Sequence, residues 1–244
     1  MKFPAWQWRI FKRAVGRRNR FKPFSRAFGS ERGRPIDRYY IDRFIEAEAA
    51  AIRGRVLEIG DDNYTRRFGG TRVTQSDVLF PTLGHPGATI VADLCDARNI
   101  PDQSFDCIIL TQVLQYIYDH HAAVRTLHRI LKPGGTVLAT LPFISAFSGK
   151  DHQLWGEHWR YTSKAARRMF ADVFGDDNVK VRSYGNLLTV TAFLHGFAVE
   201  DLDPDDFTYD DPLIEMISTV KATKPMPGIH PARMPEAEMA GTKA

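Results

Sequence analysis

Acidic side chains follow directly on a run of residues that is typical of a buried strand. The apolar run at 55–59 continues as Glu58-Ile59-Gly60-Asp61-Asp62. A glycine lets a ligand approach the backbone closely, and clustered carboxylates favour a cation. The segment contains neither GxGxxG nor GK[ST], the patterns whose backbone amides hold a dinucleotide or a nucleoside triphosphate. A phosphate-containing cofactor is therefore disfavoured here.

Two further carboxylates are expected at the ends of the next two strands. Asp77 follows Gly60 by 17 residues, and at the end of a second strand it could accept hydrogen bonds from both hydroxyls of a ribose. Asp93 ends the third apolar run and could accept from the exocyclic amine of adenine, with Leu94 against the ring. Ligands of open α/β sheets bind beyond the carboxyl ends of the strands. These residues predict a site for a cationic adenosine compound without phosphates.

Short β-branched runs alternate with amphipathic segments along most of the chain. Strands are predicted at 55–59, 71–75, 89–93, 105–111, 136–142, 179–184 and 213–220, and helices at 35–54, 163–174 and 187–199. Another apolar stripe at helical spacing stops at Lys132-Pro133-Gly134-Gly135, a strong helix terminator. Strands that alternate with helices indicate a mostly parallel sheet covered on both faces.

The composition is typical of a folded, water-soluble protein, with 43% hydrophobic and 25% charged residues in a chain of 244. The two cysteines, Cys95 and Cys107, have no CxxC spacing, which argues against a disulfide scaffold and a structural zinc site, and no metal site is predicted. No apolar run approaches the ~18–20 residues that span a bilayer, and no signal peptide is recognised. We expect a cytoplasmic protein.

Positive charge is concentrated in residues 1–34, which contain eleven Lys or Arg and one Glu, whereas the rest of the chain is net negative. Aromatic residues interleave with these cations, a pattern that suits an anionic membrane surface and, less well, nucleic acid. Alternatively, the aromatic residues dock on the main domain while the arginines are solvated. We predict a basic arm at 1–34, a folded domain at 35–223 and a flexible, proline-containing tail at 224–244.

Three motifs occur in a fixed order between residues 54 and 142. They are VLEIG at 56–60, ADLCDARNIPDQSFDCIILTQVLQYI at 92–117 and LHRILKPGGTVLATLP at 127–142. Together they resemble the class I S-adenosylmethionine-dependent methyltransferases, particularly the small-molecule, methyltransferase-11-like type. The resemblance implies a Rossmann-like, doubly wound, mostly parallel seven-stranded α/β sheet with an antiparallel last strand. It also implies S-adenosyl-L-methionine as cofactor and a small-molecule or sugar-like acceptor.

The resemblance further implies which residues would hold the cofactor. These are Glu58 and Gly60 at the methionine end, Asp77 at the ribose, Asp93 and Leu94 at the adenine edge, and Thr111 and Gln112 closing the pocket after the fourth strand.

The loop after the first strand departs from the family pattern. Family members continue with further glycines and a full helix, whereas this chain reads GDDNYTRRFGG. Either Asp61, Asp62 or Asn63 binds the cofactor's ammonium or attracts its sulfonium, or the site has decayed and the protein is a methyltransferase-like binding or scaffold protein. We favour the first hypothesis because Asp77 and Asp93 are both present.

A second polar cluster, at 151–163, follows the fifth strand, where the family places much of its acceptor site. Methyl transfer from a sulfonium needs a base only if the acceptor must lose a proton, and a histidine suits that role. We predict His158 as the base, with His152 second, and an acceptor-binding wall made of Trp155, Trp159, Arg160 and Tyr161. Alternatively, Trp159 and Tyr161 cover the sheet and Arg160 pairs with a carboxylate.

Overall fold

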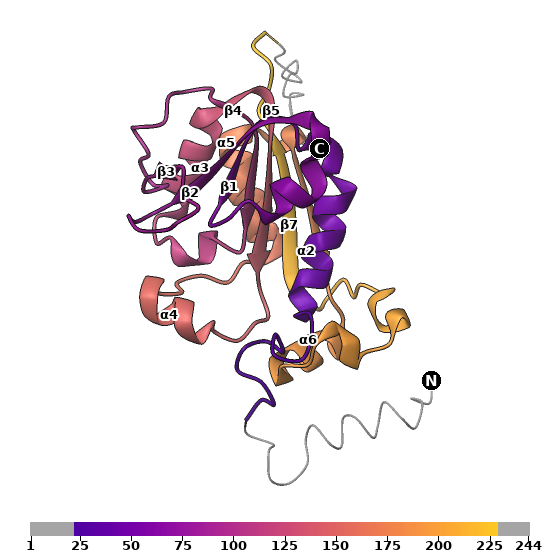
Figure 1. The fold of residues 1–244 in the computed structure, drawn as a ribbon. Coiled ribbons are helices and arrows are strands. Elements are labelled where there is room, and N and C mark those ends of the chain that lie inside the picture. Colours follow the sequence, from indigo (N-terminus) through magenta and orange to yellow (C-terminus); the bar gives the residue numbers. More distant parts are fainter. Residues whose placement is uncertain (1–21, 229–244) are drawn as a thin grey trace, which may run out of the picture.

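The computed structural model describes residues 22–228, which are built around a seven-stranded sheet (Figure 1). The strands are β1 (Gly54–Ile59), β2 (Val73–Phe80), β3 (Ile90–Val91), β4 (Phe105–Thr111), β5 (Leu131–Pro142), β6 (Val179–Tyr184) and β7 (Ile217–Thr223). Their order is β3-β2-β1-β4-β5-β7-β6, and β7 runs antiparallel to both of its neighbours. The predicted Rossmann-like sheet with an antiparallel last strand is confirmed.

Helices cover both faces of this sheet. Successive strand side chains point to opposite faces, so Cys107 and Ile109 of β4 pack with α2 (Ile36–Ala47) and α6 (Leu187–His195). Ile108 and Leu110 pack with α3 (His120–Ile130) and α5 (Ser163–Phe174) on the other face. The two cores explain why the β4 sequence is apolar at nearly every position.

Local capping fixes where the main helices begin. The Asp119 side chain accepts a hydrogen bond from the Ala122 amide at the start of α3, and Thr162 does the same for Ala165 in α5. Asn186 and Thr189 form a reciprocal capping box at the start of α6. These caps satisfy amides that a helix leaves free in its first turn.

Several predicted elements have different boundaries in the structure. The helix expected over 187–199 ends at His195, the strand expected over 136–142 begins at Leu131, and the last strand covers 217–223 instead of 213–220. The helix expected over 35–54 ends at Ala47 and is followed by a 3-10 turn at Ala49–Ala51, while Gly54 is the first residue of β1. Gly54 has φ +65°, and a Cβ there would collide with the Asp106 side chain, so the strand entry needs glycine. The second strand covers 73–80 instead of 71–75, which moves Asp77 from the strand end into its interior.

The chain covers the carboxyl ends of the parallel strands with short elements. In Figure 1, α4 (Gly149–Trp155), α6 and the segment from residue 22 lie at this lower edge. The connection from β2 to β3, residues 81–89, contains no helix. The remaining short elements are the 3-10 turns η3 (Gly70–Arg72), η4 (Leu114–Tyr116), η5 (Asp176–Asn178), η6 (Val199–Asp201) and η7 (Pro204–Phe207).

Part of the predicted basic arm belongs to the folded unit. The Phe28 ring stacks on Phe193 of α6 at 5.3 Å, and the Phe24 amide donates to the His195 carbonyl at 2.8 Å. Arg32 forms an ion pair with Asp201. These contacts support the alternative in which the aromatic residues dock on the domain, but the docked arginine is paired instead of solvated. Residues 1–21 of the arm lie outside the described range.

The first residue of the predicted tail, Lys224, contacts the folded domain. The Lys224 ammonium donates to the carbonyls of His128 at 2.7 Å and Leu131 at 2.8 Å, which fixes this residue against the end of α3. The other tail residues from 229 onward lie outside the described range. Among residues 22–228, no helix is long and apolar enough to cross a membrane.

Candidate active site

Gly60 opens a space at the carboxyl end of β1. Its amide donates to the Leu79 carbonyl of β2 at 3.0 Å, which places it level with the end of that strand. Its φ is +98°, a conformation that glycine adopts far more readily than other residues. A Cβ added there would meet nothing within 4 Å. The backbone is therefore bare and accessible where a ligand of this fold class binds.

Glu58 anchors the loop that follows. Its carboxylate accepts hydrogen bonds from the amides of Tyr64 at 3.1 Å and Thr65 at 2.8 Å, and from the Thr65 hydroxyl at 2.8 Å. Burial raises the pKa of Glu58 to about 7, and the three hydrogen bonds oppose that rise. Both carboxylate oxygens are thus used inside the protein, and the predicted contact with a cofactor stays a prediction.

The acidic loop forms a tight turn that is closed by its own side chains. Asn63 donates to Asp61 twice, from its backbone amide at 3.1 Å and from its side-chain amide at 2.8 Å. Asp62 pairs with Arg66 at 2.6 Å, one helical turn further along the chain. The chain then enters a short π-type helix, η2 (Thr65–Gly69). A tight turn and a π-type helix therefore follow Gly60, in place of the full regular helix that the resemblance implies.

Tyr64 turns its ring toward Phe68, with the centroids 6.3 Å apart, and the two belong to the core beneath α2. Burial raises the pKa of Tyr64 to about 12, so its hydroxyl keeps its proton at neutral pH. The side chain lines the cavity described next and leaves the space around Gly60 open.

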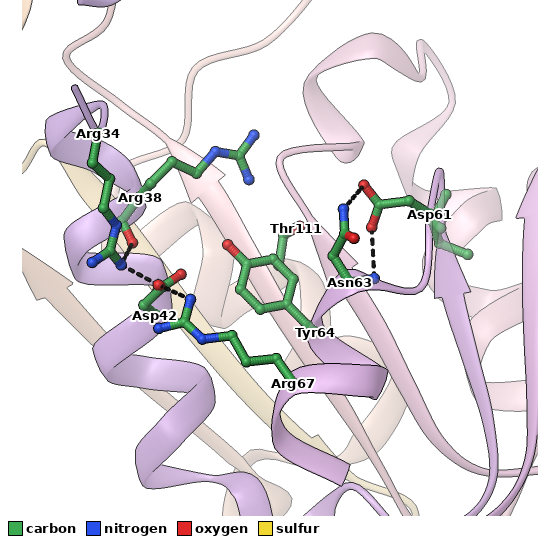
Figure 2. A pocket seen from close by; sticks show the side chains of 9 residues that line it. Arg34, Arg38, Asp42, Asp61, Asn63, Tyr64, Arg67 and Thr111 are labelled. Atoms are coloured by element: carbon green, nitrogen blue, oxygen red, sulfur yellow. Dashed lines mark hydrogen bonds and ion pairs between the residues drawn. The ribbon is translucent and has the colours of Figure 1, made fainter. Parts of the chain in front are cut away.

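A cavity of about 400 Å³ lies between α2 and the ends of β1 and β4 (Figure 2). Arg34 and Arg67 both form ion pairs with Asp42, whose side chain is only 10% exposed. Arg38 extends from α2 across the top of the cavity, beside Tyr64 and Thr111 (Figure 2). The Arg38 guanidinium is hydrogen-bonded to the Tyr64 hydroxyl, and the carboxylates of Asp37 and Asp61 interact with it electrostatically.

These cavity residues were missed in the sequence because they belong to segments interpreted for other features. Arg34 was assigned to the basic arm, and the helix from residue 35 was examined for its apolar stripe. Arg34, Arg38 and Asp42 are spaced by four residues, which places them on one face of a helical segment. That spacing was an available signal, whereas the approach of Arg67 depends on the irregular path of the loop.

The structure changes the surroundings expected for Asp77. Its carboxylate accepts from the Arg55 guanidinium at 2.8 Å, from the Gln75 side chain at 3.1 Å and from the Thr89 hydroxyl at 3.1 Å. Asp77 pairs in register with Leu57, below the end of β1. The position predicted at the strand end was wrong, because β2 continues to Phe80. A role for Asp77 at the ribose stays a prediction.

The other predicted cofactor residues do lie at the carboxyl edge. Asp93 follows β3 and accepts from the Cys95 amide at 2.8 Å, while Leu94 is buried. Thr111 ends β4 and lines the cavity. Gln112 has φ +56°, and its amide donates to the Thr140 carbonyl at 3.1 Å. A non-glycine residue in this conformation is strained, and such strain is concentrated at functional sites.

Three residues of the predicted acceptor wall use their polar atoms within the fold. The Trp159 indole donates to the carbonyls of Ile117 at 3.1 Å and Tyr118 at 3.2 Å. The buried Tyr161 hydroxyl donates to the Leu114 carbonyl at 3.1 Å. Arg160 pairs with Glu157 at 2.9 Å. These contacts favour the alternative in which the segment covers the sheet, and acceptor binding by these three residues stays a prediction.

The two candidate bases and Trp155 each contact a different aromatic residue. The exposed His158 packs edge-on against Tyr118, with ring centroids 5.4 Å apart. His152 of α4 is exposed beside Phe147 at 4.6 Å. Trp155, at the end of α4, contacts the ring of Phe80 edge-on at 5.9 Å, so α4 reaches across to the end of β2. Neither histidine lines the arginine cavity.

No group of three or more metal-ligating side chains occurs in the described part of the chain. The site is therefore described by its glycine, its carboxylates and its three arginines.

The strand order and the motifs at the carboxyl edge are similar to those of class I methyltransferases. Residues 60–139 match the family model described as a methyltransferase domain. The ubiquinone/menaquinone biosynthesis C-methyltransferase UbiE of Cellvibrio japonicus is 44% identical over 46 residues, which cover 18% of each chain. The UbiE protein of Pseudoalteromonas translucida is 34% identical over 68 residues, which cover 28% of this chain and 25% of that protein. The matches thus span a quarter or less of these curated relatives.

Solved structures of low sequence identity share the fold over most of the chain. The N-methyltransferase NodS of Bradyrhizobium japonicum, solved with S-adenosyl-L-homocysteine, has a TM-score of 0.50 at 11% identity and covers 90% of this chain and 98% of its own. The [4+2]-cyclase SpnF has a TM-score of 0.50 at 15% identity and covers 91% and 94%. One fold thus carries two different reactions in these two proteins, so function must be argued from the site.

Proposed function

We propose that the protein is an S-adenosyl-L-methionine-dependent methyltransferase that acts on a small-molecule or sugar-like acceptor. The observation that carries the proposal is the open space over Gly60, at the carboxyl end of the first strand of a methyltransferase domain. The side chains of Asp62 and Tyr64 leave this space open, because Asp62 pairs with Arg66 and the Tyr64 ring packs beside Phe68.

The residues at this edge fit the proposed cofactor. Gly60 would let the methionine portion approach the backbone, and Asp61, although hydrogen-bonded to Asn63, lies on the cavity wall with a charge that favours the cofactor's ammonium and sulfonium. Asp93 and Leu94 would hold the adenine edge. When bound, S-adenosyl-L-methionine supplies an electrophilic methyl group that bonds to an acceptor lone pair while the electrons of the broken S–C bond stay on sulfur.

The protein's own contribution is positioning and exclusion of water. A methyl group on a sulfonium is already activated, so holding the acceptor in line can provide much of the acceleration. His158 and His152 stay the candidate bases for an acceptor that must lose a proton. Both are exposed, so either would have to meet the acceptor at the outer side of the carboxyl edge.

Calorimetry on the purified full-length protein tests the proposal. S-adenosyl-L-homocysteine and S-adenosyl-L-methionine should each bind at one site per chain. A panel of small hydroxyl, amine and carbon acceptors with labelled S-adenosyl-L-methionine should then identify a labelled product. Failure of the wild-type protein to bind either compound would contradict the proposal. Binding without transfer to any acceptor would favour the alternative of a binding or scaffold protein.

A further inference from the structure

The cavity beneath α2 has more positive than negative charge. Three guanidinium groups line it, those of Arg34, Arg38 and Arg67, against the carboxylates of Asp42 and Asp61. Asp42 is shared between Arg34 and Arg67, so one anion faces two cations. Both oxygens of Asp61 already accept from Asn63. The cavity walls therefore carry one net positive charge.

The proposed cofactor would increase the net positive charge of the cavity, so the inference rests on the proposed function. S-adenosyl-L-methionine carries an ammonium, a sulfonium and a carboxylate, so it adds one further positive charge to the site. Its carboxylate offsets the charge of one guanidinium, but its ammonium and its sulfonium add two positive charges. Water screens part of this excess because the Arg67 side chain is 56% exposed, but charge that is held away from bulk water is costly unless it is paired. The filled cofactor site thus leaves two positive charges for another ligand to balance.

We propose that the methyl acceptor carries an anionic group, a carboxylate or a phosphate, and that Arg38 binds it in this cavity. The planar fork of a guanidinium matches both groups with two parallel hydrogen bonds. Arg34 and Arg67 add positive charge from the wall beside Asp42.

Arg38 is the best placed of the three arginines for this role. Arg34 and Arg67 form ion pairs with Asp42, whereas the Arg38 guanidinium has the uncharged Tyr64 hydroxyl as its hydrogen-bond partner and interacts with Asp37 and Asp61 only electrostatically. The Tyr64 hydroxyl lies on the same wall, where it is hydrogen-bonded to Arg38 and Asp42, and because burial raises its pKa to about 12 it keeps its proton at neutral pH. An anion bound here would meet donors from α2 and from the loop after β1.

Inorganic phosphate is the probe that tests this assignment. Its binding to the full-length protein would be measured by calorimetry in three states: free, saturated with S-adenosyl-L-homocysteine, and saturated with S-adenosyl-L-methionine. Phosphate should bind the S-adenosyl-L-methionine complex several-fold more tightly than the S-adenosyl-L-homocysteine complex, because only the former has the sulfonium charge. Arg38→Gln should weaken phosphate binding at least tenfold. Arg168→Gln, which removes an exposed arginine on α5, is the matched control and should leave it unchanged.

The other outcomes each decide the question. Phosphate displaced by S-adenosyl-L-homocysteine would assign the anion site to the cofactor's own carboxylate and overturn the proposal. Equal phosphate binding by wild type and Arg38→Gln, or none by the wild type, would also overturn it. Should Arg38→Gln fail to fold by circular dichroism, Arg38→Lys keeps the charge and should bind phosphate a few-fold more weakly; unchanged binding would count against the proposal. Phosphate binding without any cofactor binding would contradict the proposed function alone.

Discussion

The Glu58 carboxylate holds Thr65 through two hydrogen bonds, one from its amide and one from its hydroxyl, each 2.8 Å long. These hydrogen bonds link the carboxyl end of strand β1 to the first residue of the short helix η2. This link keeps the irregular loop 60–64 in place without the run of glycines found in related proteins. A buried acid therefore anchors the loop that follows β1.

Glu58 should make stability depend on pH. Its pKa is raised from 4.5 to about 7 in the folded protein, so the folded state holds more protons than the unfolded state between these pH values. The free energy of unfolding should therefore fall as pH rises from about 4.5 to about 7, by roughly 3 kcal/mol from this group, and level off above. Urea denaturation of wild type and Glu58→Gln measures the difference.

As pH rises from about 4.5 to about 7, the free energy of unfolding should therefore fall in the wild type relative to Glu58→Gln. Glu46→Gln, which removes an exposed carboxylate on α2, controls for the loss of one charge. A difference that stays constant from pH 4.5 to 8 would show that Glu58 titrates as an ordinary carboxyl.

Asp77→Asn should reduce stability more than it reduces cofactor affinity. The carboxylate is 6% exposed and is held by Arg55, Gln75 and Thr89. Loss of charge-assisted hydrogen bonds should lower the free energy of unfolding by about 1.5–3 kcal/mol. Affinity for S-adenosyl-L-homocysteine should change by only a few-fold. A loss of more than about tenfold in a variant that remains folded would instead assign Asp77 to the ribose.

Trp155 should report cofactor binding by fluorescence. The helix α4 contains no buried residue, and Trp155 contacts Phe80 at the end of β2, next to the expected ribose position. Binding of S-adenosyl-L-homocysteine should therefore change the environment of its indole. Trp155→Phe should remove most of the fluorescence change. Trp159→Phe should keep that change, because hydrogen bonds to two backbone carbonyls hold the Trp159 indole within the fold. An unchanged signal in Trp155→Phe would place α4 outside the cofactor's reach.

The sheet could be predicted from the sequence because its strands are buried on both faces. A run such as Phe105–Thr111 is apolar nearly throughout, and helix signals such as Lys132-Pro133-Gly134-Gly135 are local. The boundaries of the strands were harder to predict from the sequence. β2 includes Thr74, Gln75 and Ser76, which are polar and exposed, so the strand does not appear as an apolar run.

The site was only partly predictable because its contacts join distant segments. Gly60, Asp93 and Thr111 follow strands, so their placement at one edge follows from the fold class. The ion pairs of Asp42 join α2 to the loop after β1, 25 residues away at Arg67, and no local pattern encodes that approach. The pairing of Arg55 with Asp77 likewise depends on the register of two strands.

The central claim is that the space over Gly60 holds the cofactor, and calorimetry with S-adenosyl-L-homocysteine on two glycine variants tests it most directly. Gly60→Ala and Gly70→Ala both place a side chain at positive φ with nothing within 4 Å, but Gly70 precedes the amino end of β2. Each should lose on the order of 1–2 kcal/mol of stability. Gly60→Ala alone should lose at least tenfold in affinity, about 1.4 kcal/mol. Wild-type affinity in Gly60→Ala would contradict the account.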